Sequence, residues 1–335
     1  MPRSYIGVDI GRHNLRLAYR EHGLRFETHR LPENIVAEEG IRSPQVMADF
    51  LRSVRGELGI GARRCALVLS DELAIFQHVT MPPMSVEELT LNLPYEFRDY
   101  ISDDPEAYSY DYAVDRIVKD DAGKPTSMEL YTAAARKDLM DSLVNIFKRA
   151  GMGLQLVIPS PLAYMNLLAS DKLNQTVGAV GNIVVADVRF DRINISLYEG
   201  GRFLTTRVVY AGCEDIDQAI VDLTGVDSHI AQSYRQSNFE NVLETLEVEA
   251  VYDRLIFELS KVINFYSFSN PDREISAVYL AGEGAELVQL VERVAQSIDY
   301  PVWLVNSLMG DEAAHTTNAS TCALAYASML AIEGR

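Results

Sequence analysis

Cysteine is scarce in this chain of 335 residues, which has three cysteines and no CxxC pair. Cys65, Cys213 and Cys322 are isolated in the sequence. Disulfides and cysteine metal sites are built from paired spacings, whereas isolated cysteines are typical of small buried side chains in a reducing compartment. The sequence therefore predicts a cytoplasmic protein without disulfide bonds.

Basic residues and long apolar runs are lacking as well. Lysine and arginine number 30 against 48 acidic residues, which leaves a net charge of −18. A chain without a basic excess is disfavoured as a general binder of nucleic acid or of anionic membranes. The opening residues MPRSYIGVDI do not follow the pattern of a signal peptide, and there is no apolar run of eighteen residues, so we expect no direct membrane insertion. The acidic balance would suit a partner that carries a basic segment.

The signatures of several enzyme classes are absent from the sequence. The six histidines form no HxxxH or HExxH arrangement, which argues against a histidine metal centre. There is also no GxSxG, no Walker lysine motif and no Rossmann glycine fingerprint. None of the corresponding classes is predicted.

Two segments far apart in the chain are copies of one pattern. YIGVDIGRHNLRLAYREHGLRF begins at Tyr5, and IVVADVRFDRINISLYEGGRFL begins at Ile183. Each is an apolar strand ending in aspartate (Asp9 and Asp187), followed by a turn and two alternating strands joined by a glycine turn. The repeat predicts two similar lobes that face a cleft, with both carboxylates beside it.

The turn after Asp9 has features of a phosphate site. Exposed backbone N–H groups at Gly11, Arg12, His13 and Asn14 would form an anion nest, and Asp9 would hold Mg²⁺ through water. An ordinary hairpin with an aspartate cap explains the same residues and stays open as the alternative.

A third turn, Ala281-Gly282-Glu283-Gly284, lies between an apolar strand and a predicted helix. Glycines there let the backbone approach a flat ligand, and a helix N-terminus favours negative charge. A glycine turn of this kind is common between a strand and a helix. It supports a ligand site only because it follows the two strands that end in aspartate.

The middle of the chain has a different texture. Ser85 and Glu88 form a capping box that starts a helix predicted to reach about Ile101. Alternating segments at 108–119 and 127–135 predict a hairpin, and a helix is predicted at 137–150. Apolar residues at helical spacing predict core and groove lining: Met84, Leu89, Leu93, Phe97 and Tyr100.

The length and apolar content suffice for more than one core. We expect an α/β protein in which residues 1–70 and 156–178 form a first domain and 71–155 form an inserted subdomain. Residues 179–335 would form a second domain, with an outer helical part at 215–272 and a hinge at 174–181.

The order of these segments resembles the actin-like ATPase superfamily and, within it, the PilM family of type IV pilus assembly proteins. IGVDIGRHNLRLAYRE looks like the family's opening phosphate loop, and AVYLAGEGAELVQLVERV is similar to its adenosine loop. MPPMSVEELTLNLPYEFRDYI resembles a segment that sugar kinases and chaperones of the superfamily lack. The resemblance spans nearly the whole chain and implies a bilobed, ribonuclease H-like fold with an FtsA-type inserted subdomain.

The resemblance implies ATP between the lobes and Mg²⁺ at Asp9 and Asp187. It carries further nucleotide contacts over to Gly11, Arg12, His13, Asn14, Arg189, Gly212, Gln232, Arg235, Gly282, Glu283 and Gly284. The sequence departs from the family where Arg12-His13-Asn14 replace small residues, where Arg189 replaces glycine, and at 231–235, which follow the ribose-contacting AE--K pattern only in part. Arg189 would either block the phosphates or bind them, and both readings stay open. We identify no general base for hydrolysis.

The resemblance also implies a partner. PilM-like proteins use the inserted subdomain to hold the cytoplasmic N-terminal tail of a PilN-like inner-membrane protein, here in a groove lined by Met84, Leu89, Leu93, Phe97 and Tyr100. We expect a scaffold at the inner face of the cell membrane, which is held there by partners, contacts other pilus assembly proteins and has the capacity to self-associate. A nucleotide-hydrolysing enzyme or small-molecule kinase and an FtsA-like division filament stay open as alternatives.

Overall fold

The computed structural model describes residues 5–37, 40–169 and 181–333. The hinge expected at 174–181 lies outside these residues except for its last position. Among the described helices, none combines the length and the apolar character that crossing a membrane requires. The three cysteines are free and buried.

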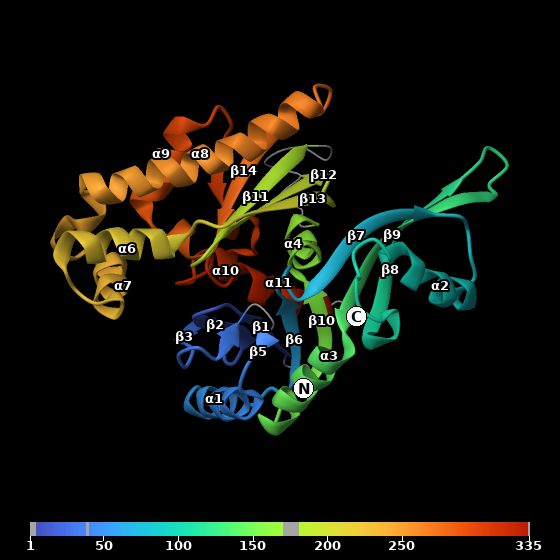
Figure 1. Cartoon of the computed structure of the whole chain (residues 1–335), viewed down its shortest axis with the longest axis horizontal. Coiled ribbons are helices and arrows are strands. Elements are labelled where there is room, and N and C mark those ends of the chain that lie inside the picture. Colours follow the sequence, from blue (N-terminus) through green and yellow to red (C-terminus); the bar gives the residue numbers. More distant parts are fainter. Residues whose placement is uncertain (1–4, 38–39, 170–180, 334–335) are drawn as a thin grey trace.

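Two five-stranded sheets of the same design form two lobes (Figure 1). The first sheet has the order β10-β6-β1-β2-β3 and consists of β1 (Tyr5–Ile10), β2 (Asn14–Arg20), β3 (Leu24–Arg30), β6 (Arg64–Leu69) and β10 (Gly153–Pro159). The second has the order β13-β12-β11-β14-β15 and consists of β11 (Asn182–Val188), β12 (Ile193–Glu199), β13 (Arg202–Val209), β14 (Ile275–Ala281) and β15 (Val302–Leu304). In both, an antiparallel meander of three strands continues into parallel strands, so the duplication read from the sequence is present in the topology.

Helices cover these sheets and join them. The helices of the lobes are α1 (Pro44–Glu57), α3 (Lys137–Arg149), α4 (Ser160–Leu168), α6 (Cys213–Thr224), α7 (Ser228–Ser237), α8 (Leu246–Ser269), α9 (Val288–Ser297), α10 (Asp311–Ala314) and α11 (Ala323–Glu333). One hydrophobic cluster contains buried residues of α4 and α11 together with residues of both sheets, such as Ala18 and Ile183. This shared core fixes the lobes to each other on one side of the cleft between them.

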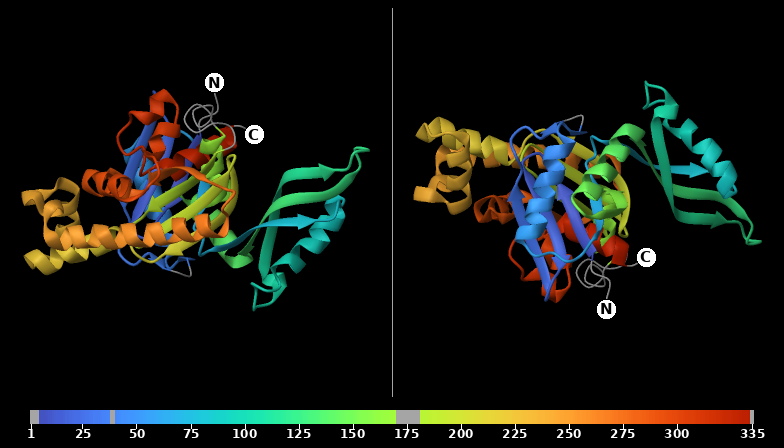
Figure 2. Two further views of the ribbon diagram at one scale, coloured as in Figure 1. Left: turned by 90° about the horizontal axis from the view of Figure 1, so that it is seen from above. Right: turned by 90° about the horizontal axis from the view of Figure 1, so that it is seen from below.

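A third sheet extends from the lobes, and Tyr131 of this sheet belongs to the core that the lobes share. The sheet has the order β7-β9-β8 and consists of β7 (Ala74–Met81), β8 (Tyr108–Lys119) and β9 (Pro125–Arg136), with helix α2 (Val86–Asn92) against one face. In all three views this part of the chain projects sideways as an arm (Figure 2). We call residues 74–136 the arm.

The start of α2 follows the sequence, and its end does not. Ser85 accepts a hydrogen bond from the Glu88 amide while the Glu88 side chain accepts one from the Ser85 amide, which is the expected capping box. The helix ends at Asn92 and gives way to a 3₁₀ turn at Leu93–Phe97, so the prediction of one helix to Ile101 is wrong. The cause is Pro94, which has no amide proton to continue the helix.

The packing of α3 bears on the division into domains. Ile146 and Phe147 of this helix belong to the core of the first lobe, together with Met47 and Leu51 of α1. Strand β10, which follows, is part of the first sheet. The expected boundaries at 71 and 155 stay a prediction, but the sheet of the arm itself runs only from β7 to β9.

Candidate functional site

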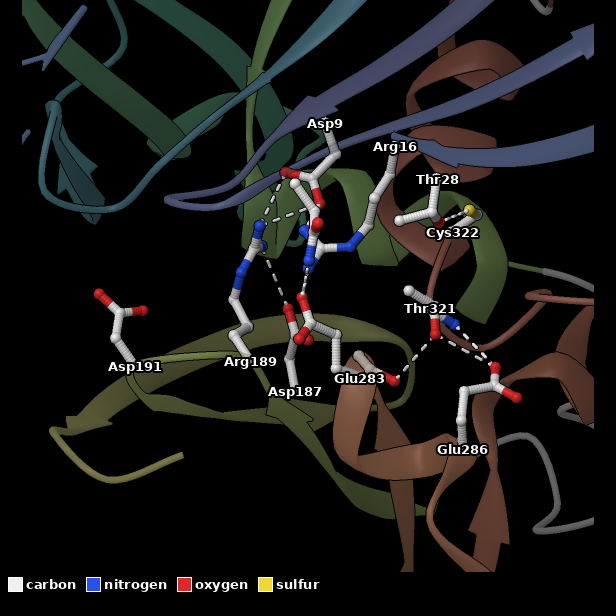
Figure 3. A network of polar contacts seen from close by, with 12 residues as sticks. Asp9, Arg16, Thr28, Asp187, Arg189, Asp191, Glu283, Glu286, Thr321 and Cys322 are labelled. Atoms are coloured by element: carbon white, nitrogen blue, oxygen red, sulfur yellow. Dashed lines mark hydrogen bonds and ion pairs between the residues drawn. The ribbon is translucent and has the colours of Figure 1, made fainter. Parts of the chain in front are cut away.

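The ends of β1 and β11 and the turn after β14 face each other across the cleft between the lobes (Figure 3). Asp9 and Arg16 come from the first lobe, and Asp187, Arg189 and Glu283 come from the second. These five charged residues form one connected set of hydrogen bonds and ion pairs, which we call the interlobe cluster.

Arg189 is the centre of the interlobe cluster. Its Nη2 donates to both carboxylate oxygens of Asp9, at 2.9 and 3.0 Å, and its Nη1 lies 3.4 Å from Oδ2 of Asp187. One guanidinium therefore bridges the two aspartates that the sequence pattern places at equivalent strand ends. The side chain of Arg189 is 14% exposed, so the bridge is largely shielded from water.

Arg16 makes a second link between the lobes. It lies directly opposite Asp9 in the antiparallel register of β1 and β2, and its Nη1 donates to Oδ2 of Asp9 at 3.1 Å. Its Nη2 donates to Oε1 of Glu283, which also accepts from Nδ2 of Asn14 at 2.9 Å. Asn14 and Glu283, both candidate nucleotide contacts, are thus bonded to each other.

The residues predicted at the ribose lie in α7 and are also engaged. Arg235 donates to both oxygens of Asp217 on α6, at 2.6 and 3.3 Å, and its Nη2 lies 4.0 Å from Oε2 of Glu283. Gln232 accepts a hydrogen bond from Arg30 on β3. The contacts of Arg235 with Glu283 and of Gln232 with Arg30 connect the helical part of the second lobe to its neighbours.

The pKa values follow from burial and from these partners. Burial would raise the pKa of Asp9, but the charges and hydrogen bonds of Arg189 and Arg16 outweigh it and hold the pKa below its usual range. Burial, together with the negative charge of Asp9, raises the pKa of Asp187. The charges of Arg189 and Arg16 and a hydrogen bond from Tyr164 compensate only in part. Glu283 has a lowered pKa for the same reason as Asp9, since Arg16 and Arg235 outweigh its desolvation. Asp9 and Glu283 are therefore held as anions.

The glycines near the cluster are explained by contacts within the protein. A Cβ at Gly212 would lie 2.5 Å from the carbonyl oxygen of Phe190 and 2.6 Å from that of Arg189. Gly282 and Gly284 pack equally closely against Asp187 and Val188. Close approach of protein to protein, without a ligand, is sufficient reason for glycine at these places.

Two residues of the predicted phosphate turn lie at the edge of the cluster. Arg12 is exposed and lies 3.4 Å from Asp191, and His13 packs against the ring of Phe190 at 4.1 Å between centroids. The pKa of His13 is lowered by partial burial and by the charges of Arg12 and Arg30, so this histidine is neutral near pH 7.

Sequence reasoning missed Arg16 and Asp217. A signal for Arg16 was available, because a charge between Leu15 and Leu17 within an apolar strand requires a buried partner. Nothing comparable marks Asp217, which lies on a helix rich in acidic residues.

The described residues of the interlobe cluster do not fit Mg²⁺ and nucleotide phosphates. Both oxygens of Asp9 accept from guanidiniums, and Mg²⁺ requires such oxygens as ligands. A Cβ at Gly11 would lie 2.9 Å from Nη1 of Arg16 and 3.4 Å from Nη2 of Arg189, so the space beside the turn is occupied by side chains. The Gly11 amide donates to the Asn14 carbonyl and is not available to an anion.

A second cleft lies where the arm joins the first lobe. It has a volume of about 660 Å³ and is lined by Ile41, Asp71, Glu72, Leu73, Ala74, Ile75, Tyr108, Ala134, Arg136, Asp138, Leu139 and Ser142. We call it the arm cleft. Its walls are apolar and acidic, and its one lining arginine, Arg136, pairs with Asp103 and Asp138.

Asp71 distinguishes the arm cleft from the interlobe cluster. One of its oxygens accepts from the Ser160 hydroxyl, but Oδ2 is buried without a hydrogen-bond partner among the described residues. Burial raises the pKa of Asp71, and the hydrogen bond from Ser160 and the more distant Arg189 offset this only in part. An unpaired carboxylate of this kind would be stabilised by a cationic ligand group.

The groove expected from the apolar residues of the arm differs from the arm cleft. Leu89, Leu93 and Phe97 are buried at 2% exposure or less, in small cores between α2, the following turn and the sheet. They are packed inside the arm and do not line an open groove, because helical spacing turned them onto the sheet. Met84 is partly buried against the same core, and Tyr100 is 61% exposed.

The duplicated lobes with an inserted arm define the class of the protein. The chain has the actin-like fold, which it shares with several solved structures. A PilM–PilN type IV pilus biogenesis complex matches with a TM-score of 0.82 at 18% identity, over 100% of this chain and 99% of that one. The ethanolamine utilization protein EutJ from Carboxydothermus hydrogenoformans matches with a TM-score of 0.60 at 13% identity, over 97% and 90% of the two chains. MreB5 of Spiroplasma citri, solved with ADP, matches with a TM-score of 0.52 at 10% identity, over 99% and 97%.

The family follows from the sequence. The chain belongs to the family of the type IV pilus assembly protein PilM, whose family model matches residues 7–333. A search of curated proteins found no match. The resemblance read from the phosphate loop, the middle segment and the adenosine loop is thereby confirmed, as is the bilobed fold class.

Proposed function

We propose that the chain is a scaffold of the type IV pilus assembly platform and holds the cytoplasmic N-terminal tail of a PilN-like membrane protein. Family membership supports the pilus role. The similar structure named as a PilM–PilN complex supports the partner, and its match covers this chain from end to end, the arm included. The tail would keep the protein at the inner face of the cell membrane.

The arm cleft is the proposed binding site, and the observation that carries it is its open volume of about 660 Å³, with apolar walls and the acidic Asp71 in its lining. Leu73, Ile75 and Leu139 supply apolar walls on which alternate side chains of an extended peptide would pack. The negative charge of Asp71 would attract a lysine, an arginine or a terminal amine of the tail, whereas Glu72 already pairs with Arg192.

The arm also offers backbone groups to such a peptide. Strands β7 and β8 are the two edges of a three-stranded sheet, and both pair only with β9 among the described strands. An extended tail that leaves the arm cleft along either edge would form main-chain hydrogen bonds there.

The experiment is a titration of the purified chain with a synthetic tail peptide of a PilN-like protein. Ser142→Arg introduces a bulky cation into the lining of the arm cleft, and Asn145→Arg introduces the same side chain on an exposed part of the same helix. We expect Ser142→Arg to weaken the peptide by at least about tenfold and Asn145→Arg to leave it unchanged. Equal affinity of Ser142→Arg and the wild type would overturn the placement of the tail.

A second variant tests the charge. Asp71→Asn removes the carboxylate and keeps the shape, so it should weaken a peptide with a basic residue and reduce the dependence of its affinity on salt. A peptide in which the basic residue is replaced by alanine should bind the wild type and Asp71→Asn equally well.

The other expectations stay separate predictions. Contacts with further pilus assembly proteins and self-association are expected from the family resemblance alone. Mg-ATP and its turnover form no part of the scaffold proposal, since the ADP in the MreB5 structure belongs to a protein that is 10% identical. A nucleotide-hydrolysing enzyme or small-molecule kinase would be revealed by steady phosphate release with substrate, and an FtsA-like filament by sedimentation with lipid vesicles.

A further inference from the structure

We propose that the position between Asp9 and Asp187, where this fold is built to hold a metal ion, is taken by the chain's own Arg189. The neighbouring part of the cleft, about 520 Å³ in volume and lined by residues such as Arg30, Gln232 and Glu286, stays open. The inference concerns the interlobe cluster alone and does not depend on what the arm binds. It assigns Arg189 a positioning role between the lobes.

The position and charge of Arg189 carry the argument. A divalent ion between Asp9 and Asp187 would bridge two carboxylates from opposite lobes, and the guanidinium of Arg189 makes that bridge here. Its planar fork presents several donors at fixed angles, so one side chain reaches both acids. Because the guanidinium stays charged, it also repels a metal ion from the same carboxylate oxygens.

The carboxylates around Arg189 are balanced by arginines of the same chain. Hydrogen bonds and ion pairs link four carboxylates and three guanidiniums into one network. Its members are Asp9, Asp187, Asp217, Glu283, Arg16, Arg189 and Arg235. Each buried acid of this set already has at least one cationic partner, which buried charges require. The buried anion of Glu283, bonded to Asn14 and Arg16, would repel a polyphosphate in the same space.

The backbone groups that would cradle phosphates are also occupied. The Gly11 amide donates to the Asn14 carbonyl at 2.9 Å, and the Arg189 amide donates to the Arg192 carbonyl at 2.8 Å. At the start of α6, the amides of Cys213 and Glu214 donate to the carbonyls of Arg189 and Phe190. These four backbone amides therefore donate to carbonyls of the same turn or of the neighbouring turn and are not available to a phosphate.

The consequence concerns the arrangement of the lobes. The shared core at α4 and α11 holds them on one side, and the interlobe cluster holds them on the other. The relative position of the lobes is therefore set by covalently attached groups, which act at every nucleotide concentration. A scaffold built in this way would keep one conformation instead of cycling between two.

The first test uses the wild-type chain. Thermal unfolding is followed with and without millimolar Mg-ATP or Mg-ADP, and Mn²⁺ binding is followed by electron paramagnetic resonance in the presence of ATP. We expect no rise in Tm and no bound Mn²⁺, whereas a ligand well above its Kd raises Tm by several degrees. Saturable Mn²⁺ binding that is lost in Asp9→Asn would overturn the proposal.

The second test uses hydrogen–deuterium exchange. Arg189→Ala should increase the exchange at the ends of β1 and β11 and at 282–286, on both faces of the cleft, by about tenfold or more. The matched control is Arg293→Ala, which removes an arginine with two acidic partners, Asp253 and Glu249, from within the second lobe. It should leave the exchange at β1 unchanged.

A third variant covers the case in which Arg189→Ala does not fold. Arg189→Lys keeps the charge but loses the fork that reaches both aspartates. It should give intermediate exchange at the same segments and still no Mn²⁺ binding. If Arg189→Lys exchanges like the wild type on both faces of the cleft, the bridge is not what holds them, and the proposal fails.

Discussion

The interlobe cluster and the arm cleft use aspartate in opposite ways. In the interlobe cluster, Asp9 is shared by two arginines of the same chain, and the space around it is filled by their side chains. Asp71 belongs to the lining of the arm cleft, which has a volume of about 660 Å³, and one of its oxygens is buried without a hydrogen-bond partner among the described residues. Both lie in a chain with a large acidic excess, so composition alone does not separate them.

The difference shows how to read a buried acid in a fold of this kind. An acid whose partners come from the same chain acts as part of the structure, because the fold has already met the cost of burying its charge. For an acid without such partners, the free-energy cost of burying the charged carboxylate is not offset within the chain, and a cationic ligand would reduce it. The region expected to bind nucleotide has the first character, and the region expected to bind protein has the second.

The largest predicted effect comes from removing the centre of the interlobe cluster. Arg189→Ala leaves Asp9 with one partner and Asp187 with no arginine, so we expect a loss of about 3–5 kcal/mol in the free energy of unfolding, measured by chemical denaturation. Arg116→Ala removes an exposed pair with Glu129 on the arm and should change the free energy of unfolding far less, because water screens the pair. Equal losses in the two variants would contradict the structural role of Arg189.

The next effect separates the arm from the lobes. Phe97 is fully buried in the small core of the arm, and Phe97→Ala should cost about 3 kcal/mol of the stability of the arm. The variant should lose tail-peptide binding and show increased exchange across β7–β9, while exchange at β1 and β11 stays at the wild-type level. Increased exchange in both places would mean that the arm and the lobes unfold as one unit.

The two aspartates should respond to pH with opposite signs. The pKa of Asp9 is lowered in the fold, so its contribution is present above its ordinary pKa of about 4 and is lost as the pH falls through the lower folded value. The pKa of Asp71 is raised, so stability decreases as the pH rises from about 4 through the raised folded value.

Isosteric variants measured at pH 7 therefore sharpen the comparison. Asp9→Asn should lose about 2 kcal/mol, since it gives up hydrogen bonds between charged groups, and Asp71→Asn should be neutral or more stable. Denaturation curves recorded between pH 3 and pH 7 provide the measurement. A loss of stability in Asp71→Asn would show that its second oxygen has a partner in solution.

The smallest effect concerns the start of α2. Ser85→Ala removes the capping hydrogen bond to the Glu88 amide and should cost about 1 kcal/mol, with faster exchange confined to 86–92. Ser53→Ala, which removes an exposed serine from within α1, should leave the arm unaffected. No change in the exchange of α2 after Ser85→Ala would show that packing of Leu89 alone holds this helix.

Most of the fold could be predicted because its signals are local. Apolar strands that end in Asp9 and Asp187, the capping box at Ser85 and the hairpin of β8 and β9 each follow from a few neighbouring residues. The end of α2 was misread although Pro94 was visible, because the apolar spacing continues beyond it. The direction in which Leu93 and Phe97 point depends on the sheet beneath them, which the spacing does not describe.

The sequence by itself determined the duplicated architecture, the family and the position of Arg189 at the second phosphate turn. It left open whether this arginine blocks or binds phosphate, since one side chain is compatible with both. Only the tertiary structure decided what Arg189 contacts, because its partner Asp9 lies 180 positions away in the chain and on the other lobe. The same is true of the arm cleft, whose walls come from separate segments that only folding brings together.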